Sequence, residues 1–387
     1  MLGIVGTAPL ALALVLFGCG GGSSGGGTPA PAPTPSPSPT TTPAPTTTAV
    51  LQNAVATFDN PWAMVFLPDG RLLVTEKPGH LQLVTTAGAK TQVSGVPAVT
   101  YSGQIGLLDV ALDPAYATNS RVWLSYEEPG AGGQRLAVAQ ATLNLVGAPG
   151  LTGLTVVWRA SPTTTGGQPG GRLAFSPDGK YVFVSTGERQ QFTPAQDASG
   201  TLGKIVRLNL DGTPAAGNPF ANTAGAKPEI WTLGHRNPYG LVFASDGRLF
   251  ESEMGPMGGD EFNLIEPGQN YGWPNVSEGD NYDGTPIPRH STNPAYTAPL
   301  LSWTPVIAPG GMIQYHGSKF VGWTGDFVLA GLVQQGIVRV RVNGGTAAEV
   351  ARISLGARIR EVEEAADGSI WVLQDGSTAK LVQLLPG

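Results

Sequence analysis

The segment from Gly255 to Glu261, which reads GPMGGDE, carries residue types that bind calcium. Backbone carbonyls at its Gly-Pro turn are followed by two adjacent carboxylates, Asp260 and Glu261. Carbonyl and carboxylate oxygens are the hard ligands that Ca²⁺ prefers. A solvated loop has the same composition, so this turn by itself is only a weak indication of a metal site.

Two further groups of residues could bind an anion. Arg358 and Arg360 stand two apart in an expected strand, which places both on one face. Arg236 and Asn237 stand between a predicted strand and a proline turn. A guanidinium donates paired hydrogen bonds to a carboxylate and is therefore well suited to recognise one. The competing interpretations are a solvated pair for the first group and a loop-capping role for the second.

A recurring unit, a turn followed by a short strand of β-branched and aromatic residues, must position these loops. It starts at Asp69, Asn119, Asp178, Asp246, Asp326 and Asp367. The first and last turns are five intervals apart, about 60 residues each, which suits a blade of four short strands with long loops. We therefore expect an all-β fold, a single six-bladed β-propeller domain over residues 50–387, with any site in its central channel or on one loop-rich face.

The composition agrees with this class. The 55 Gly and 34 Pro residues make turns frequent, and no stretch shows a sustained helical period. The net charge is −6 and there is no basic run, which argues against nucleic acid as a partner. The single Cys excludes a disulfide framework.

The residues before Asp59 carry no charge and form a separate segment. Residues 1–18 are apolar but shorter than the roughly 20 residues of a membrane-spanning helix, so we expect a signal peptide. The run LFGC, which ends at Cys19, resembles the lipobox of bacterial lipoproteins and implies that Cys19 is lipidated. The lack of Lys or Arg before it departs from that pattern, and a chance Cys is the alternative. Residues 19–49 predict a disordered Pro/Thr/Gly linker, and together these features predict an exported protein, lipid-anchored to a bacterial membrane on its periplasmic or cell-surface side.

Nine ordered segments make the chain resemble the soluble pyrroloquinoline quinone (PQQ) dependent aldose sugar dehydrogenases, the glucose/sorbosone dehydrogenase group. They are PWAMVFLPDGRLLVTE from Pro61, GQIGLLDVALDP from Gly103, GGRLAF from Gly170, LGKIVRLN from Leu202, GHRNPYG from Gly234, EMGPMGGDE from Glu253, NYGWP from Asn270, TPVIAP from Thr304 and RIREV from Arg358. The resemblance covers nearly all of residues 50–387.

The resemblance implies PQQ and Ca²⁺ as cofactors and assigns the candidate residues roles. Arg236 and Asn237 would face the quinone, Gln104 would contact the ring edge, and Arg358 and Arg360 would bind carboxylates of PQQ. The carbonyls of Gly255 and Pro256 would bind an ion that bridges to the cofactor. Asp260, Glu261 and the Tyr271 carbonyl would hold a structural calcium.

Two positions depart from the family. Gln168 stands where the family has the His that acts as general base, and an amide cannot take a proton near neutral pH. The four histidines of the chain lie in other motifs and are interpreted as packed or surface residues, so water or a carboxylate such as Glu188 would have to replace the base. Val333 stands where many relatives have a Lys that reaches a PQQ carboxylate, which leaves only arginines for that task.

The leading hypothesis is a PQQ- and calcium-dependent oxidoreductase that oxidises an aldose or related alcohol by hydride transfer to the quinone and passes electrons to an unidentified acceptor. Loss of the general base is expected to weaken it by about 10²–10⁴ in rate. One alternative is a non-catalytic propeller that binds calcium, PQQ or another ligand. A second is a calcium-dependent lactonase-like hydrolase, because one fold supports many functions.

Overall fold

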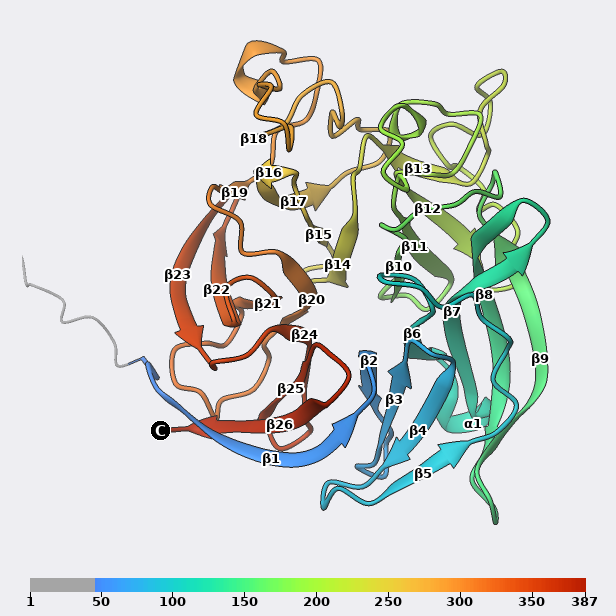
Figure 1. The fold of residues 1–387 in the computed structure, drawn as a ribbon, viewed down its shortest axis with the longest axis vertical. Coiled ribbons are helices and arrows are strands. Elements are labelled where there is room, and N and C mark those ends of the chain that lie inside the picture. The colour runs from blue at the N-terminus through green and yellow to red at the C-terminus, as the bar shows by residue number, and fades with distance from the viewer. Residues whose placement is uncertain (1–45) are drawn as a thin grey trace, which may run out of the picture. The chain divides into compact units, whose positions relative to one another are not determined.

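The computed structural model describes residues 46–387, which form six four-stranded antiparallel sheets around a central channel (Figure 1). Blade 1 contains β2 (Pro61–Phe66), β3 (Leu72–Glu76), β4 (His80–Val84) and β5 (Lys90–Val93), and blade 2 contains β6 (Leu107–Leu112), β7 (Arg121–Gly130), β8 (Gly133–Asn144) and β9 (Gly150–Arg159). Blade 3 contains β10 (Gly170–Phe175), β11 (Tyr181–Thr186), β12 (Lys204–Asn209) and β13 (Ile230–Leu233). The expected six-bladed propeller is confirmed.

The second half of the ring repeats the arrangement. Blade 4 contains β14 (Pro238–Phe243), β15 (Leu249–Glu253), β17 (Asp260–Ile265) and β19 (Leu301–Trp303), and blade 5 contains β20 (Pro309–Gln314), β21 (Phe327–Gly331), β22 (Gly336–Asn343) and β23 (Thr346–Ser354). Blade 6 contains β24 (Ile359–Glu364), β25 (Ile370–Gln374), β26 (Ala379–Pro386) and β1 (Val50–Phe58). The two-stranded ribbon of β16 (Met257–Gly258) and β18 (Gly279–Asp280), helix α1 (Tyr116–Asn119) and two 3₁₀ turns (Thr193–Ala195 and His290–Thr292) complete the described elements.

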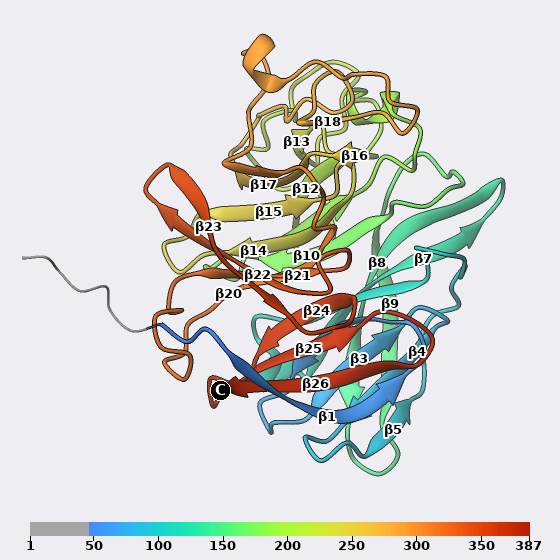
Figure 2. The ribbon, with the colours of Figure 1, turned by 60° about the vertical axis from the view of Figure 1, so that its left-hand side comes forward.

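The first and last strands of the described chain close the ring. β1 pairs antiparallel with β26, from Val50 opposite Pro386 to Phe58 opposite Ala379, and the two strands run side by side in Figures 1 and 2. The outer edge of blade 6 is therefore made from the other end of the sequence, which ties the two ends of the ring together.

The repeated turns lie where the sequence pattern predicts them. The Asp69 carboxylate accepts a hydrogen bond from the Arg71 backbone N–H (3.0 Å), and Asp246 does the same for Arg248 (3.0 Å). The glycine between them adopts a left-handed conformation, with φ of 85° at Gly70 and 86° at Gly247, which a side chain would disfavour. Each turn feeds the second strand of its blade, and β3, β15 and β21 are buried along their whole length.

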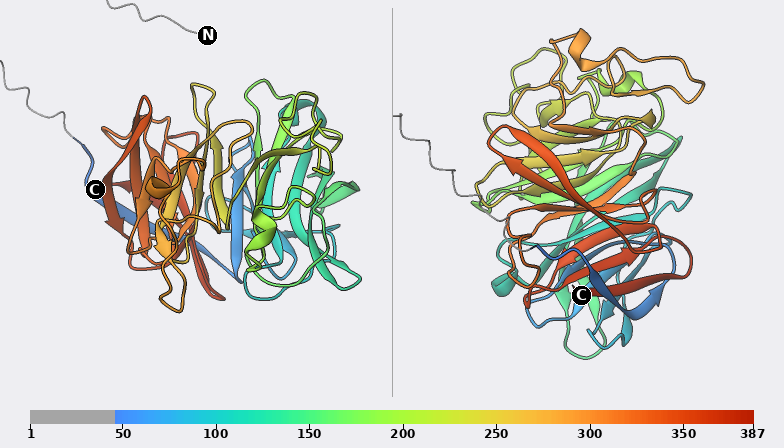
Figure 3. Two further views of the ribbon diagram at one scale, coloured as in Figure 1. Left: turned by 90° about the horizontal axis from the view of Figure 1, so that it is seen from above. Right: turned by 90° about the vertical axis from the view of Figure 1, so that its left-hand side faces the viewer.

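The hydrophobic core lies between neighbouring sheets, which follow one another as packed layers in Figure 3. Trp62, Trp123 and Leu173 belong to the largest apolar cluster, which joins blades 1, 2 and 3. Sheets buried on both faces need apolar side chains on both, and this explains the near-continuous apolar runs of the inner strands.

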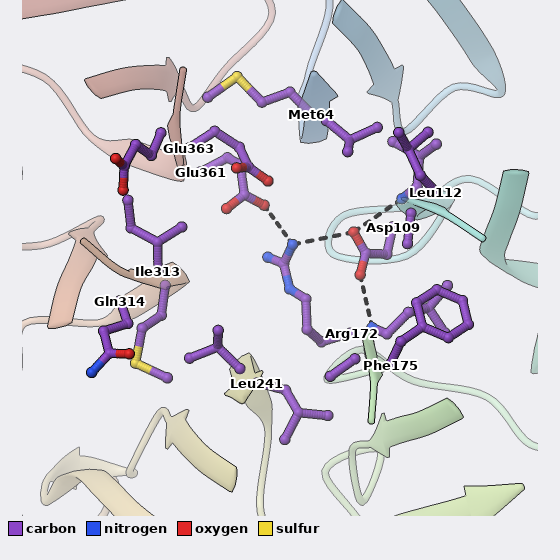
Figure 4. A pocket seen from close by; sticks show the side chains of 18 of the residues that line it. Met64, Asp109, Leu112, Arg172, Phe175, Leu241, Ile313, Gln314, Glu361 and Glu363 are labelled. Atoms are coloured by element: carbon purple, nitrogen blue, oxygen red, sulfur yellow. Dashed lines mark hydrogen bonds and ion pairs between the residues drawn. The ribbon is translucent and has the colours of Figure 1, made fainter. Parts of the chain in front are cut away.

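The channel is lined by the first strand of every blade. The C-terminal halves of these six strands surround one cavity of about 670 Å³, and their N-terminal ends therefore meet at the opposite mouth. Arg172 stands within this channel, and Figure 4 shows its guanidinium between Asp109 and Glu361. Its Nη1 lies 3.2 Å from Asp109 Oδ1 and 2.5 Å from Glu361 Oε2.

Three sequence expectations are resolved or limited by this fold. Pro238 opens strand β14 instead of forming a turn, a position where a strand tolerates Pro because its N–H is not needed. The predicted signal peptide 1–18, Cys19 and most of the 19–49 linker lie outside the described residues. Within residues 46–387, no helix has the length and apolar character needed to cross a membrane.

Candidate functional site

The predicted site residues from several blades meet at the channel mouth formed by the N-terminal ends of the inner strands. The Gln168 N–H donates to Gln104 Oε1 (2.6 Å), and the Gly170 N–H donates to Asn237 Oδ1 (3.2 Å). The Arg360 guanidinium lies over the Tyr239 ring, 5.5 Å from its centre. We call this group the cradle: Gln104, Gln168, Arg236, Asn237, Tyr239, Arg358 and Arg360.

Gln168 is buried, and both the nitrogen and the oxygen of its amide form hydrogen bonds. In the amide orientation that satisfies the surrounding hydrogen bonds, its nitrogen donates to Glu188 Oε1 (2.5 Å) and its oxygen accepts from Arg236 Nη2 (2.9 Å). The backbone is in the left-handed region with φ of 50°, an unusual conformation for a residue other than Gly. Gln168 is therefore held between a carboxylate and a guanidinium.

Glu188 lies directly beside Gln168 and is itself only 1% exposed. Its Oε2 accepts hydrogen bonds from the N–H groups of Gln191 (2.5 Å) and Phe192 (2.5 Å). Burial raises the pKa of the Glu188 carboxyl above its ordinary value, while these hydrogen bonds and the Arg236 charge oppose the shift. Glu188, which the sequence suggests as a replacement base, is thus hydrogen-bonded directly to the Gln168 amide.

Arg236 is fixed by hydrogen bonds from both of its terminal nitrogens. Its Nη1 donates to the carbonyls of Met254 (2.9 Å) and Gly255 (2.7 Å), and its Nη2 donates to the Tyr282 hydroxyl (3.1 Å). Its guanidinium carbon lies 5.2 Å from the centre of the Trp273 ring. The sequence predicts that the Gly255 carbonyl binds a calcium that bridges to the cofactor. In the structure this carbonyl accepts a hydrogen bond from the Arg236 guanidinium.

Glu253, at the end of β15, holds the backbone that carries Arg236 and Asn237. Its Oε2 accepts from the N–H groups of Arg236 (2.5 Å) and Asn237 (3.1 Å), and its Oε1 lies 3.1 Å from His235 Nδ1. Sequence reasoning missed this role, although Glu253 opens one of the motifs that carry the resemblance. A buried carboxylate that binds two successive N–H groups fixes the loop conformation.

The structure places Asp260 and Glu261 on opposite faces of β17, because successive strand residues alternate. Asp260 accepts from the N–H groups of Gly255 (2.9 Å), Ile307 (2.7 Å) and Ala308 (2.6 Å), and burial raises its pKa to about 6. Both of its oxygens are used in holding loops. The Tyr271 carbonyl lies 3.0 Å from His290 Nε2.

Glu261 instead faces Glu253. Both line a cavity of about 10 Å³ together with Gly255, a volume close to that of one water-sized sphere. The Gly255 and Glu261 oxygens are of the kind that Ca²⁺ takes, and the lining also includes Arg236. Glu253, rather than Asp260, stands beside Glu261.

Arg358 and Arg360 converge on one carboxylate, that of Asp375. Arg358 Nε lies 3.0 Å from Asp375 Oδ2, and Arg360 Nη2 lies 2.9 Å from Asp375 Oδ1. Lys77, just after the second strand of blade 1, adds a third cation, and its Nζ donates to the Gly103 carbonyl (2.9 Å). Burial, and then the charge of Arg360, lower the Lys77 pKa.

Lys77 is a lysine close to these arginines that no sequence motif indicated. Val333 is 52% exposed and lies beyond the end of β21, whereas Lys77 approaches the same arginines from another blade. No sequence spacing links residue 77 to residue 360, so only the ring of blades reveals this contact.

The cradle and its surroundings retain buried donors without partners in the described chain: Arg236 Nε, Arg189 Nε and Nη1, and the Tyr239 hydroxyl. Buried polar groups normally have hydrogen-bond partners. A planar quinone with three carboxylates needs several cations and hydrogen-bond donors in one place, and the cradle supplies both. The residues present therefore fit PQQ.

Comparisons with known proteins agree with this geometry. The family described as Glucose / Sorbosone dehydrogenase matches residues 58–383. The chain is 38% identical to aldose sugar dehydrogenase YliI of Escherichia coli, over 85% of this chain and 90% of the relative. The crystal structure of the soluble aldose sugar dehydrogenase from Escherichia coli in its apo-form superposes with a TM-score of 0.83 at 36% identity, covering 88% of this chain and 100% of that one.

A second solved structure carries the cofactor. The PQQ-bound form of an aldose sugar dehydrogenase from Streptomyces coelicolor has a TM-score of 0.73 at 30% identity, covering 88% of this chain and 99% of that chain. With the family match over most of the sequence, the fold and the cradle lead to one conclusion: the chain belongs to the glucose/sorbosone dehydrogenase family.

Proposed function

We propose that this protein oxidises an aldose sugar or related alcohol with PQQ as the electron acceptor and Ca²⁺ as the bridging ion. The observation that carries the proposal is the cluster of cations and unpartnered donors at the cradle, where Lys77, Arg358 and Arg360 lie around the carboxylate of Asp375. An anionic ligand with several carboxylates would neutralise this positive charge.

When bound, PQQ would supply the quinone that accepts a hydride from C1 of the sugar. Lys77, Arg358 and Arg360 would hold its carboxylates, and Arg236 and Asn237 would donate to its oxygens. The Gly255 carbonyl and the Glu261 carboxylate offer oxygen ligands for calcium. The oxidation also removes the proton of the C1 hydroxyl, and the Gln168 position offers no histidine for that step.

Glu188 is the group of this chain that can accept the proton, either through a water molecule or after Gln168 moves aside. Its carboxylate lies 2.5 Å from the Gln168 amide and its pKa is raised by burial, both of which favour a base near the reacting hydroxyl. We therefore expect sugar oxidation to be slower than in family members that have a histidine at this position.

A non-catalytic binding protein is the second candidate. The hydrogen bonds from Gln168 to both Glu188 and Arg236 favour it, because they hold the base position in a closed arrangement.

The test uses purified protein loaded with PQQ and excess Ca²⁺, desalted, and then mixed anaerobically with a panel of aldoses while the quinone absorption is followed. Retained PQQ that is reduced by a sugar supports the dehydrogenase. Retained but permanently oxidised PQQ supports the binding protein, and PQQ that washes away contradicts both.

Export, lipidation at Cys19 and the unidentified electron acceptor are predictions from the sequence. Mass spectrometry of the mature N-terminus would test the anchor. Acylated Cys19 in a membrane fraction, released to the soluble fraction in Cys19→Ser, is the expected result.

A further inference from the structure

A layer of buried polar side chains separates blades 3 and 4 behind the cradle. Glu251 and Glu253 lie on one face of β15, opposite Asn263 and Glu261 of β17. His235, from the loop after β13, packs against this face and stacks on Tyr271 at a ring distance of 4.8 Å. His235, Glu251 and Asn263 have no exposed surface.

The layer holds more carboxyl groups than the described residues pair with a basic side chain. Glu251, Glu253 and Glu261 bring three carboxylates, and within residues 46–387 no Lys or Arg side chain forms an ion pair with any of them. In this part of the chain the only basic side chain in contact with any of them is His235, whose Nδ1 lies 3.1 Å from Glu253 Oε1. Buried carboxylates require a cation, a proton or dense hydrogen bonding, because burial without compensation carries a large free-energy penalty.

The side chains of His235, Glu251 and Glu253 direct one donor atom each to a common space. The three donor atoms all lie within 4.8 Å of one another. This spread is compatible with a shared ion after a small inward movement, since His and carboxylate ligands bind metals at about 2.0–2.2 Å.

The outer atoms of the same three side chains are already held. His235 Nε2 lies 2.9 Å from Thr232 Oγ1, Glu251 Oε2 accepts from Asn263 Nδ2 (3.0 Å), and Glu253 Oε2 accepts from two backbone N–H groups. Metal ligands in proteins are oriented by outer partners in this way, with the far nitrogen of the His donating to an oxygen.

An independent observation comes from the atoms that have no partner. Glu251 Oε1 and Asn263 Oδ1 are both buried without a hydrogen bond in the described chain. The Asn263 amide lies between two of the carboxylates, since its Nδ2 donates to Glu251 Oε2 and to Glu261 Oε2 (3.2 Å). A cation bound at this place would give both acceptor oxygens a partner.

We propose that a divalent transition-metal ion binds between blades 3 and 4, with His235, Glu251 and Glu253 as ligands and Asn263 Oδ1 as a fourth ligand. An imidazole nitrogen in the donor set favours zinc or a similar ion over calcium, which takes oxygen ligands. The ion would join β15 to the loop that carries Arg236 and Asn237 and would therefore stabilise the cradle. Glu253 lies between this site and the small cavity at Gly255 and Glu261, which it also lines. The proposed site does not depend on the sugar dehydrogenase activity.

The experiment titrates chelator-stripped full-length protein with Zn²⁺ and with Co²⁺ in the presence of excess Ca²⁺, which occupies calcium sites. We expect one equivalent of either ion, a visible Co²⁺ absorption typical of nitrogen and oxygen ligands, and a higher melting temperature with Zn²⁺. Glu251→Gln keeps the shape of the side chain but removes the ligand charge, and its Zn²⁺ affinity should fall by more than about 100-fold.

Two further variants keep the test decisive if Glu251→Gln does not fold. Thr232→Val removes only the outer partner of His235 and should weaken Zn²⁺ binding by about 10–100-fold. Glu363→Gln removes a carboxylate in the channel, far from the layer, and should bind Zn²⁺ as the original protein does.

The proposal is overturned if no equivalent of Zn²⁺ or Co²⁺ binds while Ca²⁺ is present, or if Thr232→Val and Glu251→Gln both bind like the original protein. A Glu251→Gln protein that is as stable as the original and equally free of metal would show that a proton, not an ion, neutralises the layer.

Discussion

At the scale of single residues, the proposed oxidation depends on the pair Gln168 and Glu188. The Gln168 amide donates to Glu188 Oε1 at 2.5 Å and accepts from Arg236. An imidazole at this position would face the same carboxylate, which would hold and polarise it as a base. Glu188 and Arg236 thus surround an amide, which cannot itself act as a base.

Replacing Gln168 with His is therefore expected to raise kcat for aldose oxidation by about 10²–10⁴. The activity should rise with pH through roughly 6.5, where an imidazole loses its proton. Gln190→His is the matched control, since Gln190 is exposed in the loop after β11 that carries Glu188 and also has a positive φ (59°). Equal rates in both variants would contradict the assignment of position 168.

Lys77 is expected to hold a carboxylate of PQQ together with Arg358 and Arg360. A hydrogen bond to a charged group contributes about 1.5–3 kcal/mol, so Lys77→Gln should weaken PQQ binding by about 10–100-fold. Titration of PQQ into the calcium-loaded protein, followed by calorimetry, measures this directly. Lys180→Gln, at an exposed position, should leave the affinity unchanged.

At the scale of elements, the inner strand β24 carries charge at both mouths of the channel. Arg360 faces the cradle, whereas Glu361 and Glu363 line the cavity at the other mouth with Arg172 (Figure 4). Burial raises the pKa of Glu361 to about 7 and that of Glu363 to about 8, and the charge of Glu361 adds to the shift at Glu363.

These raised pKa values predict that the protein loses stability as the pH rises. Both lie above the ordinary 4.5, so between pH 4.5 and about 8 the folded state binds more protons than the unfolded state. The free energy of unfolding therefore falls with increasing pH in this window, with a slope of at most about 1.4 kcal/mol per pH unit from each carboxyl. Urea unfolding at pH 5 and pH 9 measures the difference.

Glu363→Gln should flatten this pH dependence, because the amide does not titrate. Glu266→Gln, at an exposed position outside the channel, should reproduce the original slope. Parallel slopes for all three proteins would show that the channel carboxylates do not control the pH dependence.

At the scale of the whole molecule, stability depends on the closure of the ring by β1. Phe58, at the end of β1, is only 2% exposed and packs in the cluster that also contains Trp371 and Leu381. Without β1, the strand β26 would become an open edge, and the cluster would lose a buried aromatic ring.

A chain that begins at residue 60 is expected to be less stable than one that begins at residue 46 by at least about 3 kcal/mol, the loss typical of removing one buried Phe. Thermal unfolding of the two chains in the same buffer tests this. Equal melting temperatures would mean that the ring holds together without the pairing of its two ends.

The amino-acid sequence by itself determined the number of blades and the identity of the family. Both rest on local signals, because a turn such as that at Asp246 and Gly247 and the strand after it form from residues that are neighbours in the chain. The cradle residues Gln104, Gln168 and Arg236 were also predicted, since each stands in a recognisable loop motif.

Only the tertiary structure decided which side chains from different blades meet. It brought Lys77 to Arg360, placed Glu253 rather than Asp260 beside Glu261, and gathered His235 with Glu251. These contacts depend on the packing of neighbouring sheets and on which face of a strand each residue occupies. Sequence spacing does not show which side chains of separate blades pack together. The proposed metal site could therefore be recognised only from the folded ring.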